Sequence, residues 1–210
     1  MDNTVATGIQ QVFERAEPGA RKAGKRRVMA CALDVFESEG IAGATIEAIR
    51  AHAESSIGSI YHHFGNKEGL VAALFFAAMN DQAALAGPRM AAARTPRDAI
   101  RASIGAYLEW VSAQPRLARF LYQARATVAA GPHGPDLHEC NRQKHRALRQ
   151  WLMRGIAEGS VRELPKETYV PLLIGQSESY CRAWLSERVK GRPADHIEVF
   201  ADAAWRSIAV

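Results

Sequence analysis

Helical periodicity runs through almost the whole chain, and it restricts the possible folds more than any other feature of the sequence. From Arg21 onward, apolar residues recur every three or four positions, as they do along one face of an α-helix. No stretch shows sustained two-residue alternation rich in Val, Ile and Thr, so strands are not needed to explain the pattern. The sequence therefore predicts an all-α protein.

Proline and glycine residues divide this pattern into segments. The first segment begins at about Arg21 and ends near Gly40. Two short helices should follow, with Thr45 and Ser56 as their N-terminal caps, and then a longer helix over 67–86. We expect five further helices, which lie near 96–113, 115–129, 136–158, 167–190 and 194–208.

The segments suggest a division into parts of unequal size. Residues 1–20 have weak periodicity and end in Pro18 and Gly19, which predicts a flexible N-terminal arm. The three helices within 21–66 form one small domain. The remaining helices, over 67–210, form a larger helical domain, and the helix at 67–86 links the two.

Composition and charge fit an ordinary globular protein of 210 residues with a formal net charge of +5. This charge permits a polyanionic partner without requiring one. The N-terminus lacks the apolar core of a signal peptide, and the longest apolar run, at 70–79, is too short to span a bilayer. Three widely spaced cysteines fit a reducing compartment. We therefore expect a cytoplasmic protein with no membrane partner.

The two short helices, at 45–53 and 56–63, are separated by only two or three residues. Such a pair meets at a steep angle, which is the helix-turn-helix arrangement. Its second helix can enter the DNA major groove with its N-terminal residues nearest the base edges. A run of basic residues just before the first helix would add a positive edge, formed by Arg21, Lys22, Lys25, Arg26 and Arg27.

A specific pattern of residues extends through this region. It resembles the DNA-binding region of the TetR family of transcriptional regulators over roughly residues 25–72, in the order Phe36-x3-Gly40-x4-Thr45-x3-Ile49-x3-Ala53-x2-Ser56-x-Gly58-x-Ile60-Tyr61-x-His63-Phe64-x2-Lys67-x2-Leu70. The resemblance implies an N-terminal three-helix, helix-turn-helix domain that is followed by a larger C-terminal helical domain for ligand binding and dimerisation. It implies a repressor that a small-molecule effector releases from a palindromic DNA operator.

The resemblance also assigns individual roles in DNA binding. By this comparison, Thr45, Tyr61, His63 and Lys67 would contact phosphates, and Ser55, Ser56, Ser59 and His62 would lie at or near the bases. A homodimer would form through the helices near 167–190 and 194–208. Effector binding in the larger domain would move the helix at 67–86 and change the separation of the two DNA-binding domains.

Three positions depart from the family pattern. Arg50 replaces a small residue, Glu54 replaces the glycine of the turn, and Ser55 replaces an apolar residue. A left-handed backbone at position 54 would cost about 1–2 kcal/mol with Glu in place of Gly. Glu54 would also repel phosphate unless Arg50, one helical turn earlier, pairs with it.

Several residues suggest chemistry other than DNA binding. His62 and His63 are adjacent and so point about 100° apart on a helix, which makes them poor joint metal ligands. Ser56 lies in a segment similar to a nucleophile elbow, but that motif requires a preceding strand. A looser group could hold zinc only if three or more of its members converged, namely His133, Asp136, His138, Cys140 and His145. We expect no metal, cofactor or catalytic residue.

The larger domain carries most of the aromatic residues. Core packing explains many of them, but an effector pocket would also be mostly apolar, and Tyr107, Trp110 and Trp151 are the candidates for lining it. An all-helical enzyme and a protein-interaction module remain as alternative functions. The sequence contains no P-loop, dinucleotide fingerprint or zinc-protease motif to favour the enzyme.

Overall fold

The computed structural model describes residues 3–210, with side chains from Gly8 onward. Within this range the chain is helical, and its single bridge between extended residues joins Val161 and Ala209. This confirms the predicted all-α class. The helices form two compact units, one of residues 1–81 and 116–141 and the other of residues 82–115 and 142–210. The predicted boundaries at 21–66 and 67–210 stay a prediction.

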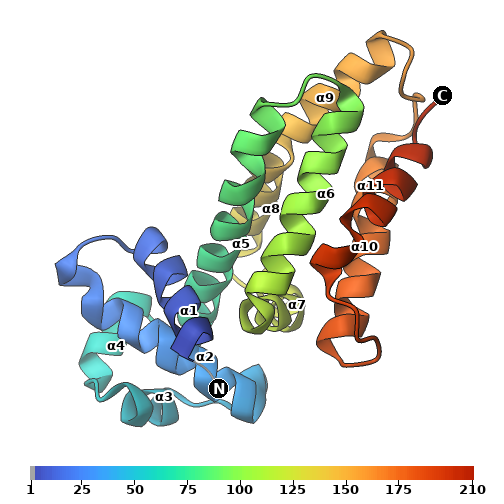
Figure 1. Cartoon of the computed structure of the whole chain (residues 1–210). Helices are drawn as coiled ribbons and strands as arrows, with labels where there is room; N and C mark the ends of the chain where they lie inside the picture. Colours follow the sequence, from blue (N-terminus) through green and yellow to red (C-terminus); the bar gives the residue numbers. More distant parts are fainter. Residues whose placement is uncertain (1–2) are drawn as a thin grey trace. The chain divides into compact units, whose positions relative to one another are not determined.

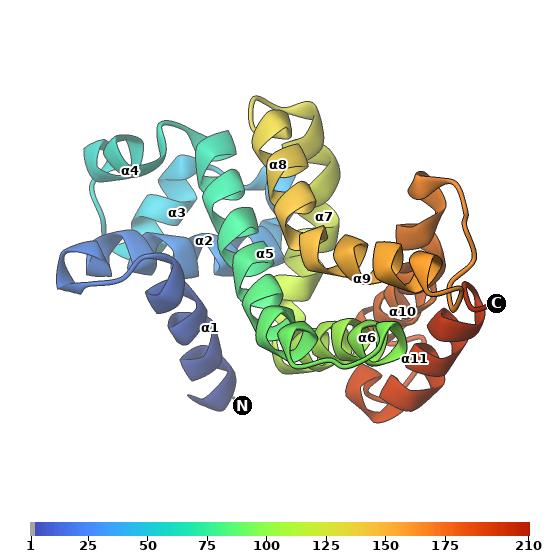
Figure 2. The same ribbon diagram turned by 90° about the horizontal axis from the view of Figure 1, so that it is seen from above.

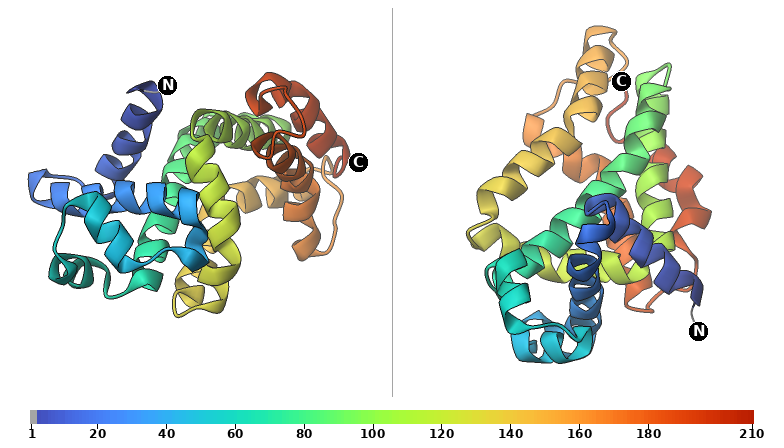
Figure 3. Two further views of the ribbon diagram at one scale, coloured as in Figure 1. Left: turned by 90° about the horizontal axis from the view of Figure 1, so that it is seen from below. Right: turned by 90° about the vertical axis from the view of Figure 1, so that its left-hand side faces the viewer.

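The first unit begins with a helix that the sequence pattern did not predict. Helix α1 (Asn3–Ala16) contacts α2 (Ala23–Gly43) and crosses it at an angle (Figure 3). Ile9, Val12 and Phe13 on one of its faces are buried. Arg15 at its end forms an ion pair of 2.7 Å with Asp81, which lies in α5 (Lys67–Ala91). The flexible arm expected over 1–20 is therefore a packed helix through Ala16, while residues 1 and 2 lie outside the described residues.

The helix-turn-helix pair follows α2, as predicted (Figure 1). Gly40 interrupts α2 with a φ of 74°, a conformation that glycine adopts readily, and the last three residues of α2 turn away from the main helix axis. Helices α3 (Ile46–Ala53) and α4 (Ile57–Phe64) are each two turns long. Ile46, Ile49, Ala53, Ile60 and Phe64 bury the apolar faces of both.

Helix α5 (Lys67–Ala91) begins in the first unit and ends in the second. It continues one turn past the predicted end because Pro88 lies inside it without terminating it. By length and composition α5 could cross a membrane, but half of its most apolar window is buried in the structure, as in a core helix of a soluble fold. The expectation of no membrane partner stays a prediction.

Two helices from the middle of the chain complete the first unit. Helices α7 (Pro115–Ala130) and α8 (Gly134–Lys144) follow one another and are joined by a short turn (Figure 2). Phe120 of α7 stacks on Phe36 of α2, with ring centroids 5.7 Å apart. The segment expected as one helix at 136–158 is broken at His145, after which α9 (Arg146–Ala157) begins.

The second unit is built around α6 (Pro96–Ala113). Thr95 and Asp98 cap the N-terminus of this helix with reciprocal hydrogen bonds of 3.1 Å. Ile100, Ile104 and Leu108 on this helix are almost fully buried. Helices α9, α10 (Tyr169–Leu185) and α11 (Ile197–Arg206) pack against α6. The predicted segments at 167–190 and 194–208 thus correspond to α10 and α11, each flanked by a short 3-10 helix on its N-terminal side, at Lys166–Thr168 and Pro193–His196.

Candidate nucleic-acid interface

Both helices of the pair are capped by the residues that the sequence indicated. The Thr45 hydroxyl accepts a hydrogen bond from the Ala48 amide at 3.1 Å, and the Ser56 hydroxyl accepts one from the Ser59 amide at 3.1 Å. Each cap satisfies an amide that has no partner within the first turn of its helix. Each hydroxyl keeps a proton that it can donate to a phosphate or base acceptor.

The turn between the two helices has a left-handed backbone at position 54, where Glu stands in place of the glycine of the family pattern. Glu54 has φ 48° and ψ 42°, and the amides of Glu54 and Ser55 both donate to the Arg50 carbonyl. The side chains of Arg50 and Glu54 are exposed, and the ion pairs of the described residues do not join them. The turn therefore keeps the helix-turn-helix geometry at the cost of backbone strain at Glu54.

Helix α4 divides sharply between a buried and an exposed face. Ile60 and Phe64 are 1% and 8% exposed, whereas Ile57 and Tyr61 are 41% and 48% exposed. A Cβ atom at Gly58 would meet nothing within 4 Å, so this position lies on the open side of the helix. Large apolar and aromatic side chains on an open helix face, beside small residues, suit close approach to a groove.

The two histidines lie at the C-terminal end of α4, with ring centroids 5.3 Å apart. Burial lowers the pKa of His63, and the positive charges of His62, Lys25 and Lys22 lower it further. A neutral imidazole still offers one N–H donor to a phosphate. Within residues 3–210, no three His, Cys, Asp or Glu side chains gather as metal ligands, although His133 and Asp136 lie 3.1 Å apart.

Lys67, which the resemblance assigns to a phosphate, contacts the protein backbone in this structure. Its ammonium nitrogen donates to the carbonyl oxygens of Ile41, Ala42 and Ala44 at 3.1, 3.1 and 3.0 Å. These carbonyls belong to the end of α2 and the residue before Thr45. All three donors of the ammonium therefore point at the protein backbone in this structure.

Much of the basic run is also engaged within the first unit. Lys25 pairs with Glu17 and lies 5.5 Å from the Phe64 ring centroid. Burial opposes ionisation of Glu17, yet the hydrogen bond from Lys25 and the charges of Lys25 and Lys22 leave its pKa below the ordinary value. Arg26 donates to the carbonyls of Glu17 and Gly19 at 2.7 and 2.8 Å. Arg21 and Arg27 remain as exposed cations.

An ion-pair cluster that the sequence analysis did not predict joins α7 to α2 and α3. Arg116 donates to Asp34 at 2.5 Å and to Glu37 at 2.7 Å. Asp34 also faces His52 of α3, with 3.4 Å between the oxygen and the ring nitrogen. Because the partners are 79 and 82 residues apart in sequence, no local pattern could have paired them.

The three residues predicted to line an effector pocket lie in different surroundings. Trp110 is only 3% exposed and belongs to the core of the second unit, while the Trp151 ring nitrogen donates to the Met90 carbonyl at 3.2 Å. Tyr107 hydrogen-bonds to Cys181, whose pKa is raised to about 12, mainly by burial. None of the three lines either of the two cavities described next.

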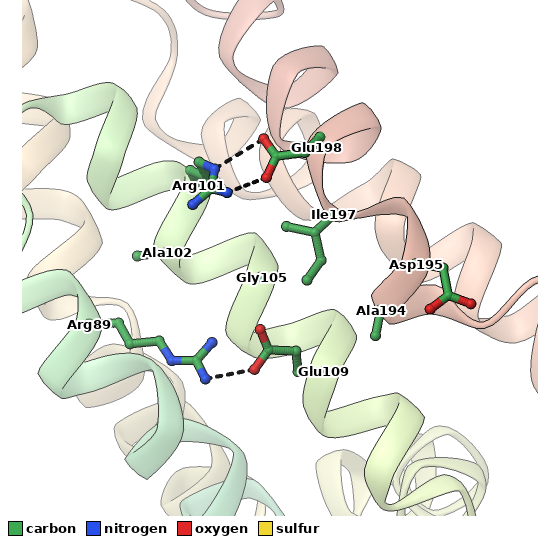
Figure 4. Close-up of a pocket in the computed structure, with 9 residues that line it drawn as sticks. All are labelled: Arg89, Arg101, Ala102, Gly105, Glu109, Ala194, Asp195, Ile197 and Glu198. Carbon is green, nitrogen blue, oxygen red and sulfur yellow. Dashed lines mark hydrogen bonds and ion pairs between the residues drawn. The ribbon is translucent and has the colours of Figure 1, made fainter.

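The first cavity has a volume of about 440 Å³ and is bounded by α5, α6 and the start of α11. Arg89 donates to Glu109 at 2.6 Å, and Arg101 forms a two-bonded pair with Glu198 (Figure 4). Between these pairs lie Ala102, Gly105 and Ile197. The cavity therefore has charged groups at both ends and small or apolar side chains between them.

The second cavity is a shallow surface along α10, with a volume of about 720 Å³. Small residues alternate with larger ones along it, and Phe200 of α11 borders one side. The full lining is Pro171, Leu172, Gly175, Gln176, Ser179, Tyr180, Ala183 and Phe200. Val199 on α11 is 66% exposed.

Comparisons with known proteins agree with this geometry. A family model described as bacterial regulatory proteins, tetR family, matches residues 28–74. The HTH-type transcriptional repressor SCO4008 of Streptomyces coelicolor is 30% identical over 142 residues, which cover 67% of this chain and 70% of that protein. The chain belongs to the tetR family of bacterial regulatory proteins. As a member, it is a DNA-binding transcriptional regulator and not an enzyme.

The similarity extends beyond the DNA-binding region of this tetR-family protein. The HTH-type transcriptional regulator BetI of Burkholderia mallei is 27% identical over 180 residues, which cover 84% of this chain and 88% of that protein. A TetR family transcription regulator from Marinobacter aquaeolei matches the fold with a TM-score of 0.76 at 17% identity, over 90% of this chain and 97% of that one. FadR from Bacillus subtilis, solved with stearoyl-CoA, has a TM-score of 0.75 at 17% identity, over 87% and 98%.

Proposed function

We propose that this regulator is a repressor that leaves a near-palindromic operator when a small molecule binds in the larger domain. The observation that supports DNA binding best is the two-faced helix α4, with Ile60 and Phe64 buried and Ile57 and Tyr61 exposed. In a helix-turn-helix, the open face of this second helix meets the major groove. The two half-sites would lie about 34–36 Å apart.

We further propose a division of the DNA contacts into base contacts and phosphate contacts. Ser55, Ser56, Ser59 and His62 lie at or near the bases, and Thr45, Tyr61 and His63 contact phosphates. The division predicts different outcomes for different changes. Tyr61→Ala should weaken binding to all sequences about equally, whereas Ser59→Ala should change sequence preference. Selection of duplexes from a random library by each variant would measure this, and equal behaviour of the two variants would contradict the division.

The homodimer is proposed to form through α10 and α11. Support comes from the shallow cavity along α10, where Gly175, Ser179 and Ala183 would allow another helix to approach closely, and from the exposed Val199. Gly175→Arg would fill this surface. Sedimentation analysis should then show a monomer for the variant and a dimer for the wild-type protein. A dimer that persists in Gly175→Arg would place the interface elsewhere.

Tyr107, Trp110 and Trp151 remain the predicted effector contacts, but the packing of Trp110 counts against it. For the effector we favour the cavity of about 440 Å³, because this volume lies within the range of ligand pockets, roughly 300–1,000 Å³. It borders both the end of α5 and the start of α11, so a ligand there would contact the linking helix and a helix of the proposed dimer interface. We place the protein in the cytoplasm, where its DNA would be.

A further inference from the structure

We infer that Lys67 is a positioning residue that fastens the turn between α2 and α3 to the first turn of α5. The inference rests on the proposed DNA-binding function. It starts from the three hydrogen bonds of 3.0–3.1 Å that the ammonium donates to the carbonyls of Ile41, Ala42 and Ala44. A lysine ammonium has three N–H donors, so this set uses all of them.

The position of these carbonyls explains why a cation belongs there. The last carbonyls of a helix have no partner within the helix and carry its partial negative charge. The kink at Gly40 turns the end of α2 so that two of them, with Ala44, surround one point. If the ammonium moved to a phosphate, these oxygens would lose charge-assisted hydrogen bonds, and the Ala44 carbonyl belongs to a residue that is buried.

Through this contact Lys67 controls where α3 begins. Ala44 precedes Thr45, the residue that caps α3, so holding the Ala44 carbonyl fixes the entry to the helix. The side chain of Lys67 reaches back 23–26 residues to do so. The start of α5 is thereby tied to the first helix of the helix-turn-helix pair.

The same turn of α5 also holds the end of α4. A Cβ atom on Gly69 would lie 2.0 Å from the Phe64 carbonyl oxygen, so only glycine permits this approach. The Asn66 side chain accepts a hydrogen bond from the Gly69 amide at 2.7 Å and caps α5. Residues 66–69 therefore contact both flanks of the pair, and any reorientation of the first turn of α5 carries α3 and α4 together.

Comparing specific and nonspecific DNA separates positioning from phosphate contact. A phosphate contact supports binding to any sequence, so losing it weakens binding to all duplexes by a similar factor. A positioning residue matters most where α4 must match base edges. Losing it weakens operator binding far more than binding to random DNA. Simple loss of folded protein would reduce both by the same factor.

The experiment uses the full-length protein and a duplex that the wild-type protein selects from a random library. Binding to this duplex and to a scrambled duplex of equal length is measured for wild type, Lys67→Met, Lys67→Arg and Arg27→Gln. Arg27→Gln is the matched control, because it also removes one positive charge from the same unit but changes an exposed side chain. Circular dichroism confirms that each variant is folded at the temperature used.

We expect Lys67→Met to bind the selected duplex about tenfold or more weakly, because charged hydrogen bonds are lost, while its binding to scrambled DNA follows Arg27→Gln. Lys67→Arg should also lose selectivity, since a planar guanidinium cannot donate to three converging carbonyls in the same way. If Lys67→Met is unfolded, the selectivity of Lys67→Arg between the two duplexes tests the inference by itself. Equal losses on both duplexes, with full recovery in Lys67→Arg, would overturn the inference. Failure of the wild-type protein to select any duplex would instead contradict the proposed function.

Discussion

The helix-turn-helix pair and the second unit place their functional residues by different physical rules. In the pair, Thr45 and Ser56 cap helices within four residues of their own positions, and Ile60 and Phe64 anchor α4 at helical spacing. In the second unit, the cavity brings together α5, α6 and α11, with Arg101 and Glu198 97 residues apart in sequence. The caps of the pair depend on neighbouring residues in the sequence, whereas the cavity of the second unit depends on tertiary packing.

The largest effect that would sharpen this contrast is expected at Trp110. If it is a core residue of the second unit, as its 3% exposure indicates, Trp110→Ala should lower the free energy of unfolding by about 3–5 kcal/mol. Urea denaturation of the purified protein measures this. A variant with wild-type stability but an altered effector response would show that Trp110 is an effector contact and not a core residue.

Ile60 and Ile57 test the two faces of α4 with the same substitution. Ile60→Ala should destabilise the protein by about 2–5 kcal/mol, because its side chain is almost fully buried. Ile57→Ala, at 41% exposure, should change stability by at most about 0.5 kcal/mol and affect DNA binding instead. Thermal unfolding and DNA titration of both variants distinguish the faces. Similar destabilisation by the two would show that α4 does not divide in this way.

The two caps should contribute a smaller and nearly equal amount. Thr45→Ala and Ser56→Ala each remove a hydrogen bond of 3.1 Å to an unpaired amide, and each should cost about 0.5–2 kcal/mol. Ser56→Asp can accept the same bond and should recover most of the stability, although its charge would weaken DNA binding. Chemical denaturation of the three variants provides the measurement. No loss in either alanine variant would mean that tertiary contacts, and not local caps, hold the pair.

Replacing Glu54 with Gly should raise the stability of the protein by a similar or smaller amount. Because its φ of 48° favours glycine, Glu54→Gly should stabilise the protein by about 1 kcal/mol, whereas Glu54→Ala should not. The melting temperatures of the two variants are compared at equal concentration. A gain in Glu54→Ala alone would point to removal of the negative charge and not to relief of backbone strain.

The smallest effect concerns His63 and pH. Its pKa is below the ordinary value, so the unfolded chain binds the proton more readily than the folded one. Stability should therefore decline as pH falls through about 6.5, the ordinary value for histidine, until the folded-state pKa is reached. A nearby phosphate favours the protonated ring, so DNA binding should strengthen over the same range. His63→Gln should reduce both trends, and unchanged pH profiles in this variant would assign them to another group.

The sequence predicted features that depend on neighbouring residues better than features that depend on tertiary packing. Patterns within one turn of helix identified the two caps and the ends of α6. Helix α1 was not predicted, because Ile9, Val12 and Phe13 are too few apolar positions to outweigh the weak periodicity of residues 1–20 and the nearby Pro18 and Gly19. The role of Lys67 could not be predicted, because its acceptors are backbone carbonyls that only the kink at Gly40 brings together.

The central claim is that this tetR-family protein binds DNA through α4 as a regulator, and the salt dependence of binding to a selected duplex tests it most directly. The affinity should fall steeply between 50 and 200 mM salt, with a log–log slope of about −0.9 for each phosphate contact, and the selected duplex should be nearly palindromic. A flat salt response, or no enrichment of any duplex by the wild-type protein, would contradict the account.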